Sequence, residues 1–470
     1  MIASLLAMGV AVVSGHVCWR QWGPLRHPSP LECVGHALPL AVVLVGVVML
    51  VGSSLGVGYT MGTLLAPLAL LAVATLVVSV RGPRRPSAPA ARPGVVGRFA
   101  LAVIATEAIL IVADVLASPS LADWDAWAIW GMKAKAFFVD GDLRGYLSRA
   151  SSYEFSWPAR PCLSSLAQAF VYTALGRVDE GGARLFQVAL WASLLVVFWA
   201  NLRRRFGVDR ALVWTAILAT VPNLTYQASA GVGNPALGLY LFAAFAAFEA
   251  WAEEPRPLRM LSAASLLAGA GLARDEGLPL GALLLVALLL VRPPLPRRRM
   301  GVWLAVVAFA AVVPHVLWVR LAAAYGARAV PGIHDYWAQG ALLERLLAHA
   351  RDLPAIFAAI GGELARPDVQ ARSSPLEQAL GVSLFWPLFA LALVAFRAWH
   401  HDRGAVVAAM VVVGGLLGYT AGFVLFDYRD LPDLLDNWVF VLDRHAIALV
   451  PLALRVTASA FNKGGEPASR

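Results

Sequence analysis

The sequence predicts an all-α polytopic membrane protein, and three observations support this prediction. Hydrophobic residues make up 59% of the 470 residues. Charged residues make up only 14%, whereas soluble domains carry roughly 25%. The apolar residues fall into runs close to the ~20 residues that a membrane-spanning helix needs. Together these features exclude a soluble enzyme, a disordered tail protein and a disulfide scaffold.

The apolar runs predict about thirteen transmembrane helices. No basic region precedes the first run, so we expect a retained span and not a cleaved signal peptide. Residues 1–97 form an N-terminal extension of three spans with a basic cytoplasmic loop, 98–456 form the core, and 457–470 form a cytoplasmic tail. The expected spans are 2–18, 36–55, 60–80, 98–117, 183–201, 210–226, 235–252, 258–273, 277–292, 300–322, 380–398, 404–426 and 438–456.

The runs 258–273 and 277–292 are predicted to be two short helices. A single helix across both would be ~50 Å long at 1.5 Å per residue. It would exceed a ~30 Å hydrocarbon core and bury Arg274, Asp275 and Glu276 near its middle. We therefore predict that residues 274–276 form a surface turn.

The run 162–176 is shorter and is more typical of an interfacial helix than of a span. If it does not span, every basic loop falls on one side of the membrane, which the positive-inside rule makes the cytoplasmic side. The net charge of +9 is then an orientation signal, and nucleic acid is not needed to explain it. The basic loops are 81–98, 203–210, 256–259, 292–299 and 397–403.

The opposite face receives two long loops, 118–182 and 323–379, together with short turns. Irregular polar backbone is tolerated only outside lipid or along a cavity, and loops commonly carry function. We therefore expect the functional residues on this outer face. The short turns are 227–234, 274–276 and 427–437.

Aromatic and basic residues open the first long loop. Trp124, Trp127 and Trp130 recur every three residues, a spacing typical of one stripe of a helix at a membrane surface. Lys133 and Lys135 are two residues apart and point to different faces of a helix. We expect at most one of the two lysines to meet a ligand.

Two carboxylates, Asp123 and Asp125, follow the span 98–117 directly. Such residues can cap the N-terminus of a helix. Alternatively, one of them is a general base that takes a proton from an acceptor hydroxyl. The sequence leaves both interpretations open.

The order of these motifs resembles the GT-C superfamily of membrane glycosyltransferases. An outer-face aspartate opens an amphipathic helix that ends at Asp140-Gly141, and an aromatic-proline stretch precedes a short apolar helix. The resemblance is strongest to bacterial relatives of the dolichyl-phosphate-mannose–protein mannosyltransferases and of the lipid A aminoarabinose transferases. Those families have Tyr/His-Pro-Pro-Leu where this chain has Tyr153 to Leu163, with Arg160 between two prolines.

Other motifs extend the resemblance over roughly residues 98–456. Residues 203–207 are similar to the basic-Phe-Gly turn of these families. Asn234 stands where relatives often have an aspartate, and residues 273–277 resemble their Lys-x-Glu-Gly turn with Arg274 in place of lysine. Asp443 to Pro451 is similar to the Arg-Tyr…Pro start of a late span.

The resemblance implies a GT-C-like core that transfers a sugar from a polyprenyl-phosphate donor to a lipid, glycan or protein acceptor. It places the site on the periplasmic face of a bacterial cytoplasmic membrane, with no cofactor, although a divalent metal is compatible with such chemistry. Asp125 is the favoured base and Asp123 the alternative. The substrate-binding residues are expected to be Lys133, Lys135, Arg160, Asn234, Arg274, Glu276 and Arg444.

Two other classes of function remain open. A transporter or flippase of polyprenyl-linked sugars predicts ionisable residues within spans and broken helices in an internal repeat. Glu107 and Asp114 are the main acids within a span, and the two halves show no similarity. The third class is a catalytically inert assembly partner. In that case Arg444 is an interfacial arginine, and residues 274–276 only solvate a turn.

Overall fold

The computed structural model describes residues 2–22, 30–79, 92–253, 260–291, 297–327, 354–355, 358, 385–395, 399–426 and 446–462. These residues are helical, with no strand among them, as the composition predicts. Within this described part, five helices are long and apolar enough to cross a membrane, and the others are shorter. The five are Leu31–Ser54, Val95–Ala117, Glu180–Phe206, Asn234–Ala252 and Met300–Ala324. The count of thirteen spans therefore stays a prediction.

The first three helices pack together and onto the core. They are α1 (Ile2–Trp22), α2 (Pro30–Ser54) and α3 (Met61–Ser79). A side chain at Gly15 of α1 would overlap the carbonyl oxygen of Ala37, so the backbones of α1 and α2 approach closely there. The extension is not separate from the core, because α2 also packs against α7, α8 and α12.

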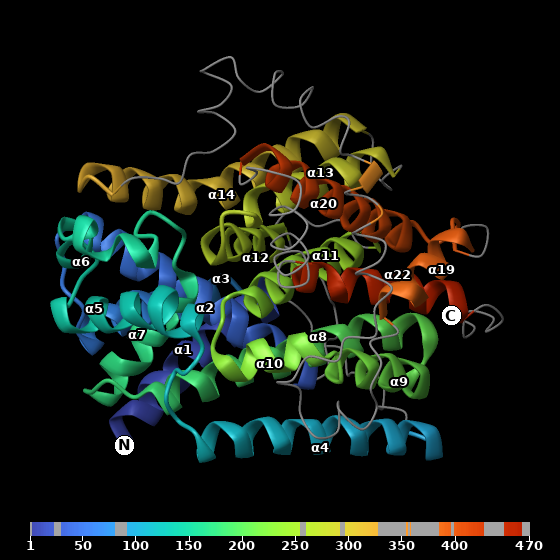
Figure 1. Ribbon diagram of the computed structural model, residues 1–470, viewed down its shortest axis with the longest axis horizontal. Coiled ribbons are helices and arrows are strands. Elements are labelled where there is room, and N and C mark those ends of the chain that lie inside the picture. The colour runs from blue at the N-terminus through green and yellow to red at the C-terminus, as the bar shows by residue number, and fades with distance from the viewer. Residues whose placement is uncertain are drawn as a thin grey trace.

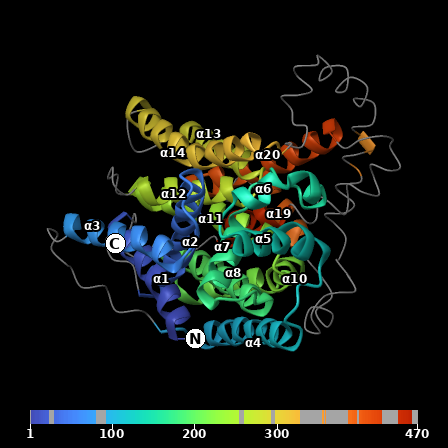
Figure 2. The same cartoon turned by 90° about the vertical axis from the view of Figure 1, so that its left-hand side faces the viewer.

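The core helices form a bundle flanked by α4 and α14 on opposite sides, as Figures 1 and 2 both show. These two helices expose many apolar side chains, including Phe99, Ile109 and Phe309, which suits a lipid-facing surface. The core helices are α4 (Val95–Ala117), α7 (Leu163–Leu175), α8 (Glu180–Phe206), α9 (Val208–Ala219), α10 (Pro222–Ala230), α11 (Asn234–Glu253), α12 (Met260–Ala273), α13 (Gly277–Leu290), α14 (Arg297–Ala324), α19 (Phe385–Val394), α20 (Arg403–Phe426) and α22 (Val450–Phe461).

One expected pair of helices is confirmed by the structure, and one expected span is wrong. The predicted pair of short helices is confirmed, since α12 ends at Ala273 and α13 begins at Gly277. The single span expected at 210–226 is wrong, because the chain breaks between α9 and α10. Pro222 lacks the backbone N–H that would continue α9, and it occupies the first turn of α10 instead.

Two further segments add detail to the expectations. The apolar run 162–176 forms α7, and most of its side chains are buried among α1, α2, α5 (Met132–Asp140) and α8. Its interfacial, non-spanning position stays a prediction. The last helix continues through Phe461, and Ser459 on it is buried. The tail expected from residue 457 is therefore partly helix. Much of the expected span 438–456 lies outside the described residues.

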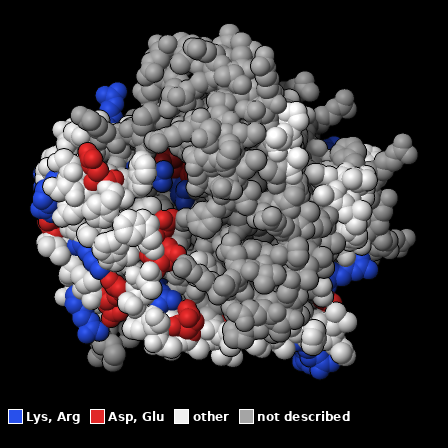
Figure 3. All heavy atoms as spheres, viewed as in Figure 1, with Lys and Arg blue, Asp and Glu red and all other residues white. Residues whose placement is uncertain are grey.

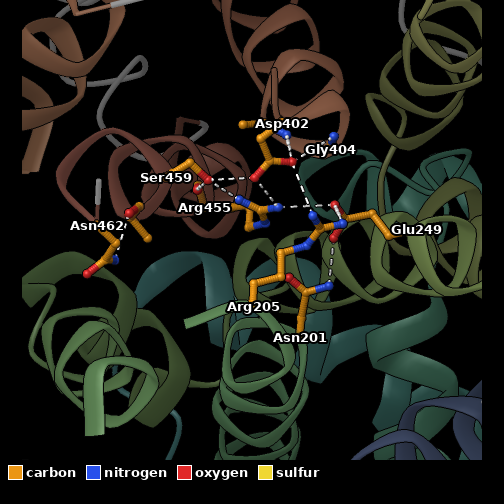
Figure 4. A network of polar contacts seen from close by, with 10 residues as sticks. Asn201, Arg205, Glu249, Asp402, Gly404, Arg455, Ser459 and Asn462 are labelled. Carbon is orange, nitrogen blue, oxygen red and sulfur yellow. Dashed lines mark hydrogen bonds and ion pairs between the residues drawn. The ribbon is translucent and has the colours of Figure 1, made fainter. Parts of the chain in front are cut away.

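Charged residues gather at the two ends of α11. Asn234 begins the helix beside Arg274, and Glu249 lies fifteen residues later, ~22 Å along a helix. Figure 4 shows the cluster around Glu249, which joins α8, α11, α20 and α22. We name it the Glu249 cluster; its members are Asn201, Arg205, Glu249, Asp402, Arg455 and Ser459.

Three arginines that are expected to mark the cytoplasmic side, Arg203, Arg204 and Arg205, pair with buried acids. Arg205 donates to Glu249 at 2.9 Å. Arg455, which lies in the expected span 438–456, is fully buried and donates to Asp402 at 2.8 Å. Arg203 and Arg204 bind the two oxygens of Glu32 at 2.8 and 2.9 Å. The basic turn at 203–205 thus also ties α8 to α2 and α11.

Candidate functional site

The first long loop carries Asp125, the expected base, on a π-helix. This element, η1 (Asp125–Gly131), leads directly into α5. Oδ1 of Asp123 accepts hydrogen bonds from the backbone N–H of Asp125 at 2.9 Å and of Ala126 at 3.3 Å. Asp123 therefore caps this helix, which is one of the two interpretations of the sequence. Its other oxygen accepts a hydrogen bond from the Tyr226 hydroxyl at 2.8 Å.

A buried arginine, Arg184, fixes the start of this loop. It donates to the carbonyl of Ser229 at 2.7 Å, to Asp114 at 3.0 Å and to the carbonyls of Ser118 and Ser120. One guanidinium thereby joins α4, α8 and α10 beside η1. This ion pair explains why an acid, Asp114, lies within a predicted span.

Trp124, which directly precedes η1, and Trp127 and Trp130 within it do not form a single stripe. Trp124 is 62% exposed, whereas Trp130 is 3% exposed. A π-helix bonds i to i+5 and has more residues per turn than an α-helix, so residues three apart separate around its axis. Trp127 contacts the Trp124 ring, with centroids 5.5 Å apart, and stacks on Phe155, with centroids 6.3 Å apart.

The two lysines of α5 have different partners. Lys135 pairs with Glu180 at 2.5 Å, and Glu180 also accepts a hydrogen bond from the backbone of Leu121. Lys133 is fully buried and donates to the carbonyls of Trp157 at 2.8 Å and Arg160 at 3.3 Å. Burial lowers the pKa of Lys133 to about 8.

The turn at residues 157–160 presents a cation with spare hydrogen-bonding capacity. The Arg160 guanidinium lies 4.5 Å from the Trp157 ring centroid, and its Nε lies 3.7 Å from a carboxylate oxygen of Asp275. Among the described residues, this Nε donates no hydrogen bond. Burial and the neighbouring Arg274 both lower the pKa of Arg160, so an anion here would be stabilised.

A chain of polar side chains joins the α12–α13 turn to α10 and α11. Arg274 donates to both oxygens of Glu276, each at 3.0 Å, and to the side-chain oxygen of Asn234. Asn234 donates to Gln227 at 2.6 Å, and Gln227 donates to Asn223 at 2.8 Å. The turn is tight, because a side chain at Gly277 would overlap the carbonyl of Ala270.

These segments converge on one region. The charges of Arg274, Asp275, Glu276 and Asp125 all act on Arg160, so residues far apart in the sequence share one electrostatic environment. Figure 3 shows acidic and basic side chains interspersed on the left of that view, where Figure 1 places α5 and α6 (Arg144–Ser148). Partial burial and the neighbouring Glu276 raise the pKa of Asp275.

Most of the residues expected at the site are thus brought together. Asp125, Arg160, Asn234, Arg274 and Glu276 belong to this region, with Lys133 beneath it. Lys135 is engaged by Glu180 instead. Arg444 lies outside the described residues, as does nearly all of the loop 323–379. In the described part, no group of three or more His, Cys, Asp or Glu residues could hold a metal ion.

Sequence reasoning missed several contributors. Asp275 is beside Arg274 in the chain, and that adjacency was the available signal. Tyr226 and Trp157 lie close in sequence to Asn234 and Arg160, but only Asn234 and Arg160 were expected to bind substrate. Trp318 donates to the carbonyl of Ala159 at 2.7 Å, and no sequence signal connects two residues so far apart.

Comparisons with known proteins cover part of the chain. Residues 159–318 match the family described as dolichyl-phosphate-mannose-protein mannosyltransferase. No curated protein sequence matches. One similar solved structure is the archaeal oligosaccharyltransferase AglB from Archaeoglobus fulgidus, in complex with an inhibitory peptide and a dolichol-phosphate, at 10% identity and a TM-score of 0.37. The alignment covers 77% of this chain but only 56% of AglB.

The matched segment begins at the Arg160 turn and ends at Trp318, which bonds that turn. It contains Asn234, Arg274 and Glu276, the residues joined by direct hydrogen bonds. The resemblance to the GT-C membrane glycosyltransferases is therefore confirmed over residues 159–318.

Proposed function

We propose that this protein is a membrane glycosyltransferase that moves a sugar from a polyprenyl-phosphate donor to an acceptor hydroxyl at the outer face of the cytoplasmic membrane. The observation that carries the proposal is the approach of Arg160 to the Arg274–Glu276 turn, where its Nε lies 3.7 Å from Asp275, with Asp125 near enough to act electrostatically on Arg160. The matched family is named for a lipid-phosphate sugar donor, which agrees with a site that brings a carboxylate close to arginines.

Asp125 is the proposed general base. Asp123 uses one carboxylate oxygen to cap η1 and the other to bind Tyr226, so its position serves the helix. Asp125 projects from the first turn of that helix and acts electrostatically on Arg160. In the reaction its carboxylate takes the acceptor proton while the acceptor oxygen attacks the anomeric carbon.

Arg160 is the proposed cation for the leaving group. As the bond between the anomeric carbon and the phosphate oxygen breaks, its electron pair remains on the lipid phosphate. A guanidinium already held in place stabilises that developing charge more effectively than water would. Arg274 is held by Glu276 and Asn234, which fixes the neighbouring positive charge and the position of the turn.

The test is transfer from a radiolabelled polyprenyl-phosphate sugar in membranes that carry Asp125→Asn. The amide keeps the shape of the side chain but cannot accept the proton, so transfer should fall by about 10²–10⁴-fold. The matched control is Glu154→Gln, which neutralises an exposed carboxylate of the same loop and should leave transfer unchanged. Near wild-type transfer by Asp125→Asn, at equal expression, would remove Asp125 from the mechanism.

A proteoliposome assay separates this function from transport. If lipid-linked sugar crosses the bilayer while no acceptor becomes glycosylated, the glycosyltransferase proposal is wrong. Transfer of label to an acceptor without movement across the bilayer supports it.

A further inference from the structure

The ammonium group of Lys133 is buried beneath the candidate site and is bound by backbone. It donates to the carbonyl of Trp157 at 2.8 Å and to the carbonyl of Arg160 at 3.3 Å. The side chain has no exposed surface. A donor lipid that approaches from outside would therefore meet the turn at residues 157–160 before it met this lysine.

Three carbonyls of this turn, those of Trp157, Ala159 and Arg160, accept hydrogen bonds. Trp157 accepts from Lys133 and from the backbone N–H of Arg160, which lies 3.0 Å away. Ala159 accepts from the indole of the fully buried Trp318 at 2.7 Å. Lys133 belongs to α5 and Trp318 belongs to α14. Two separate helices therefore hold residues 157–160 by hydrogen bonds.

The turn needs this support because its backbone is strained. Trp157 has φ of +52°, the left-handed region that non-glycine residues rarely adopt. Such conformations persist where the surroundings determine them, and they concentrate at functional sites. The consequence is a fixed Arg160, with its guanidinium over the Trp157 ring and directed to Asp275.

We propose that Lys133 is a positioning residue that acts through Arg160, holding the guanidinium ready for the donor phosphate without touching the phosphate itself. This rests on the proposed function, in which Arg160 binds the leaving group. Lys133 thereby differs from the phosphate-binding lysine that the sequence suggests.

The test is a double-mutant cycle on the affinity of the purified, full-length protein for undecaprenyl phosphate. Arg160→Met should weaken binding by roughly 10- to 100-fold, because it removes charged hydrogen bonds. Lys133→Met should weaken binding by about tenfold when Arg160 is present and should have no further effect in the Arg160→Met protein. Arg177→Met removes the same charge from a 74%-exposed side chain and should leave affinity unchanged in both backgrounds.

Each result has a distinct meaning. If Lys133→Met weakens binding by the same factor in both backgrounds, Lys133 acts independently of Arg160 and the positioning proposal is wrong, while the proposed function stands. If Arg160→Met leaves the affinity unchanged, the role of Arg160 in the proposed function fails first. A general defect in packing would also weaken both backgrounds equally, so non-additivity separates positioning from mere destabilisation.

A second variant covers the case in which Lys133→Met does not fold. Trp318→Phe keeps an aromatic side chain, although a smaller one, and removes the N–H that binds the Ala159 carbonyl. It should weaken undecaprenyl phosphate binding by a few-fold when Arg160 is present. In the Arg160→Met protein it should have no further effect on binding. Equal weakening in both backgrounds would overturn the proposal.

Discussion

The Tyr226 hydroxyl donates a hydrogen bond to Asp123 at 2.8 Å, across 103 residues of sequence. Because the other oxygen of Asp123 caps η1, this contact ties α10 to the first turn of the helix that carries Asp125. The two aspartates therefore have separable tasks, since one holds the helix and the other is proposed to react.

Substitution of Asp123 should depend on whether the new residue can cap a helix. Asparagine caps as well as aspartate, whereas alanine costs about 1 kcal/mol of helix stability. We expect Asp123→Asn to retain most transfer activity and Asp123→Ala to lose a large part of it, measured as initial rates at equal protein. Complete loss in Asp123→Asn, with Asp125→Asn active, would exchange the roles of the two residues.

Substitution of Gly277 should disrupt the site without altering a charged residue. A Cβ there would overlap the Ala270 carbonyl and would displace the turn that holds Arg274. We expect Gly277→Ala to lower both the yield of folded protein and the rate of transfer. Gly281→Ala is the matched control, because its Cβ would lie 3.4 Å from Leu267, a tolerable contact. Similar behaviour of the two variants would contradict this account of the turn.

Disruption of the Glu249 cluster should affect stability more than catalysis. Glu249→Gln leaves the buried Arg455 with one carboxylate partner fewer, and loss of a partner from a buried ion pair costs about 3–5 kcal/mol. We expect a clear fall in the thermal midpoint of the purified protein but normal transfer at low temperature. Arg177→Met breaks an exposed pair and should cost under about 1 kcal/mol.

The buried Lys133 should leave a signature in the pH dependence of stability. Its pKa is about 8 in the native protein and about 10.4 when unfolded. Between these values the unfolded chain binds more protons, so the contribution of Lys133 to the free energy of unfolding rises with pH. We expect the thermal midpoint of the wild type to rise relative to that of Lys133→Met between pH 8 and pH 10. A constant difference would mean that Lys133 keeps an ordinary pKa.

Sidedness can be tested with single cysteines, because Cys18, Cys33 and Cys162 are all buried. Ser152, in the first long loop, and Arg210, which follows the C-terminal end of α8, are both exposed. We expect an impermeant thiol reagent to label Ser152→Cys in intact cells and to label Arg210→Cys only after the membrane is opened. The reverse pattern would place the candidate site in the cytoplasm.

The sequence predicts what depends on local chemistry. Apolar run length predicts the helices, and the cost of burying charge predicts the break at residues 274–276. The capping of η1 by Asp123 follows from its place before the helix. The order of short motifs predicts that Arg160, Asn234 and Arg274 belong to one candidate site, and the structure brings these three residues together.

The sequence cannot predict contacts that depend on packing between distant segments. From the sequence, Arg203 and Arg205 are interpreted as orientation signals. In the structure they also form ion pairs with Glu32 of α2 and Glu249 of α11. Lys133 looks like a ligand-binding cation until α5 carries it beneath residues 157–160. A proline at position 222 is itself a signal for a helix break, but the continuous apolar run 210–226 favoured a single span.

The π-helix that begins at Asp125 makes the candidate site sensitive to chain length. Its wide turn accommodates extra backbone relative to an α-helix. Deletion of a single alanine between Asp125 and Trp130 would allow a regular α-helix to form and would shorten the backbone between Asp125 and Lys133 by one residue. A one-residue deletion that preserves every charged and aromatic side chain would thus move Asp125 relative to the arginines, so the length of this segment matters to the site as well as its composition.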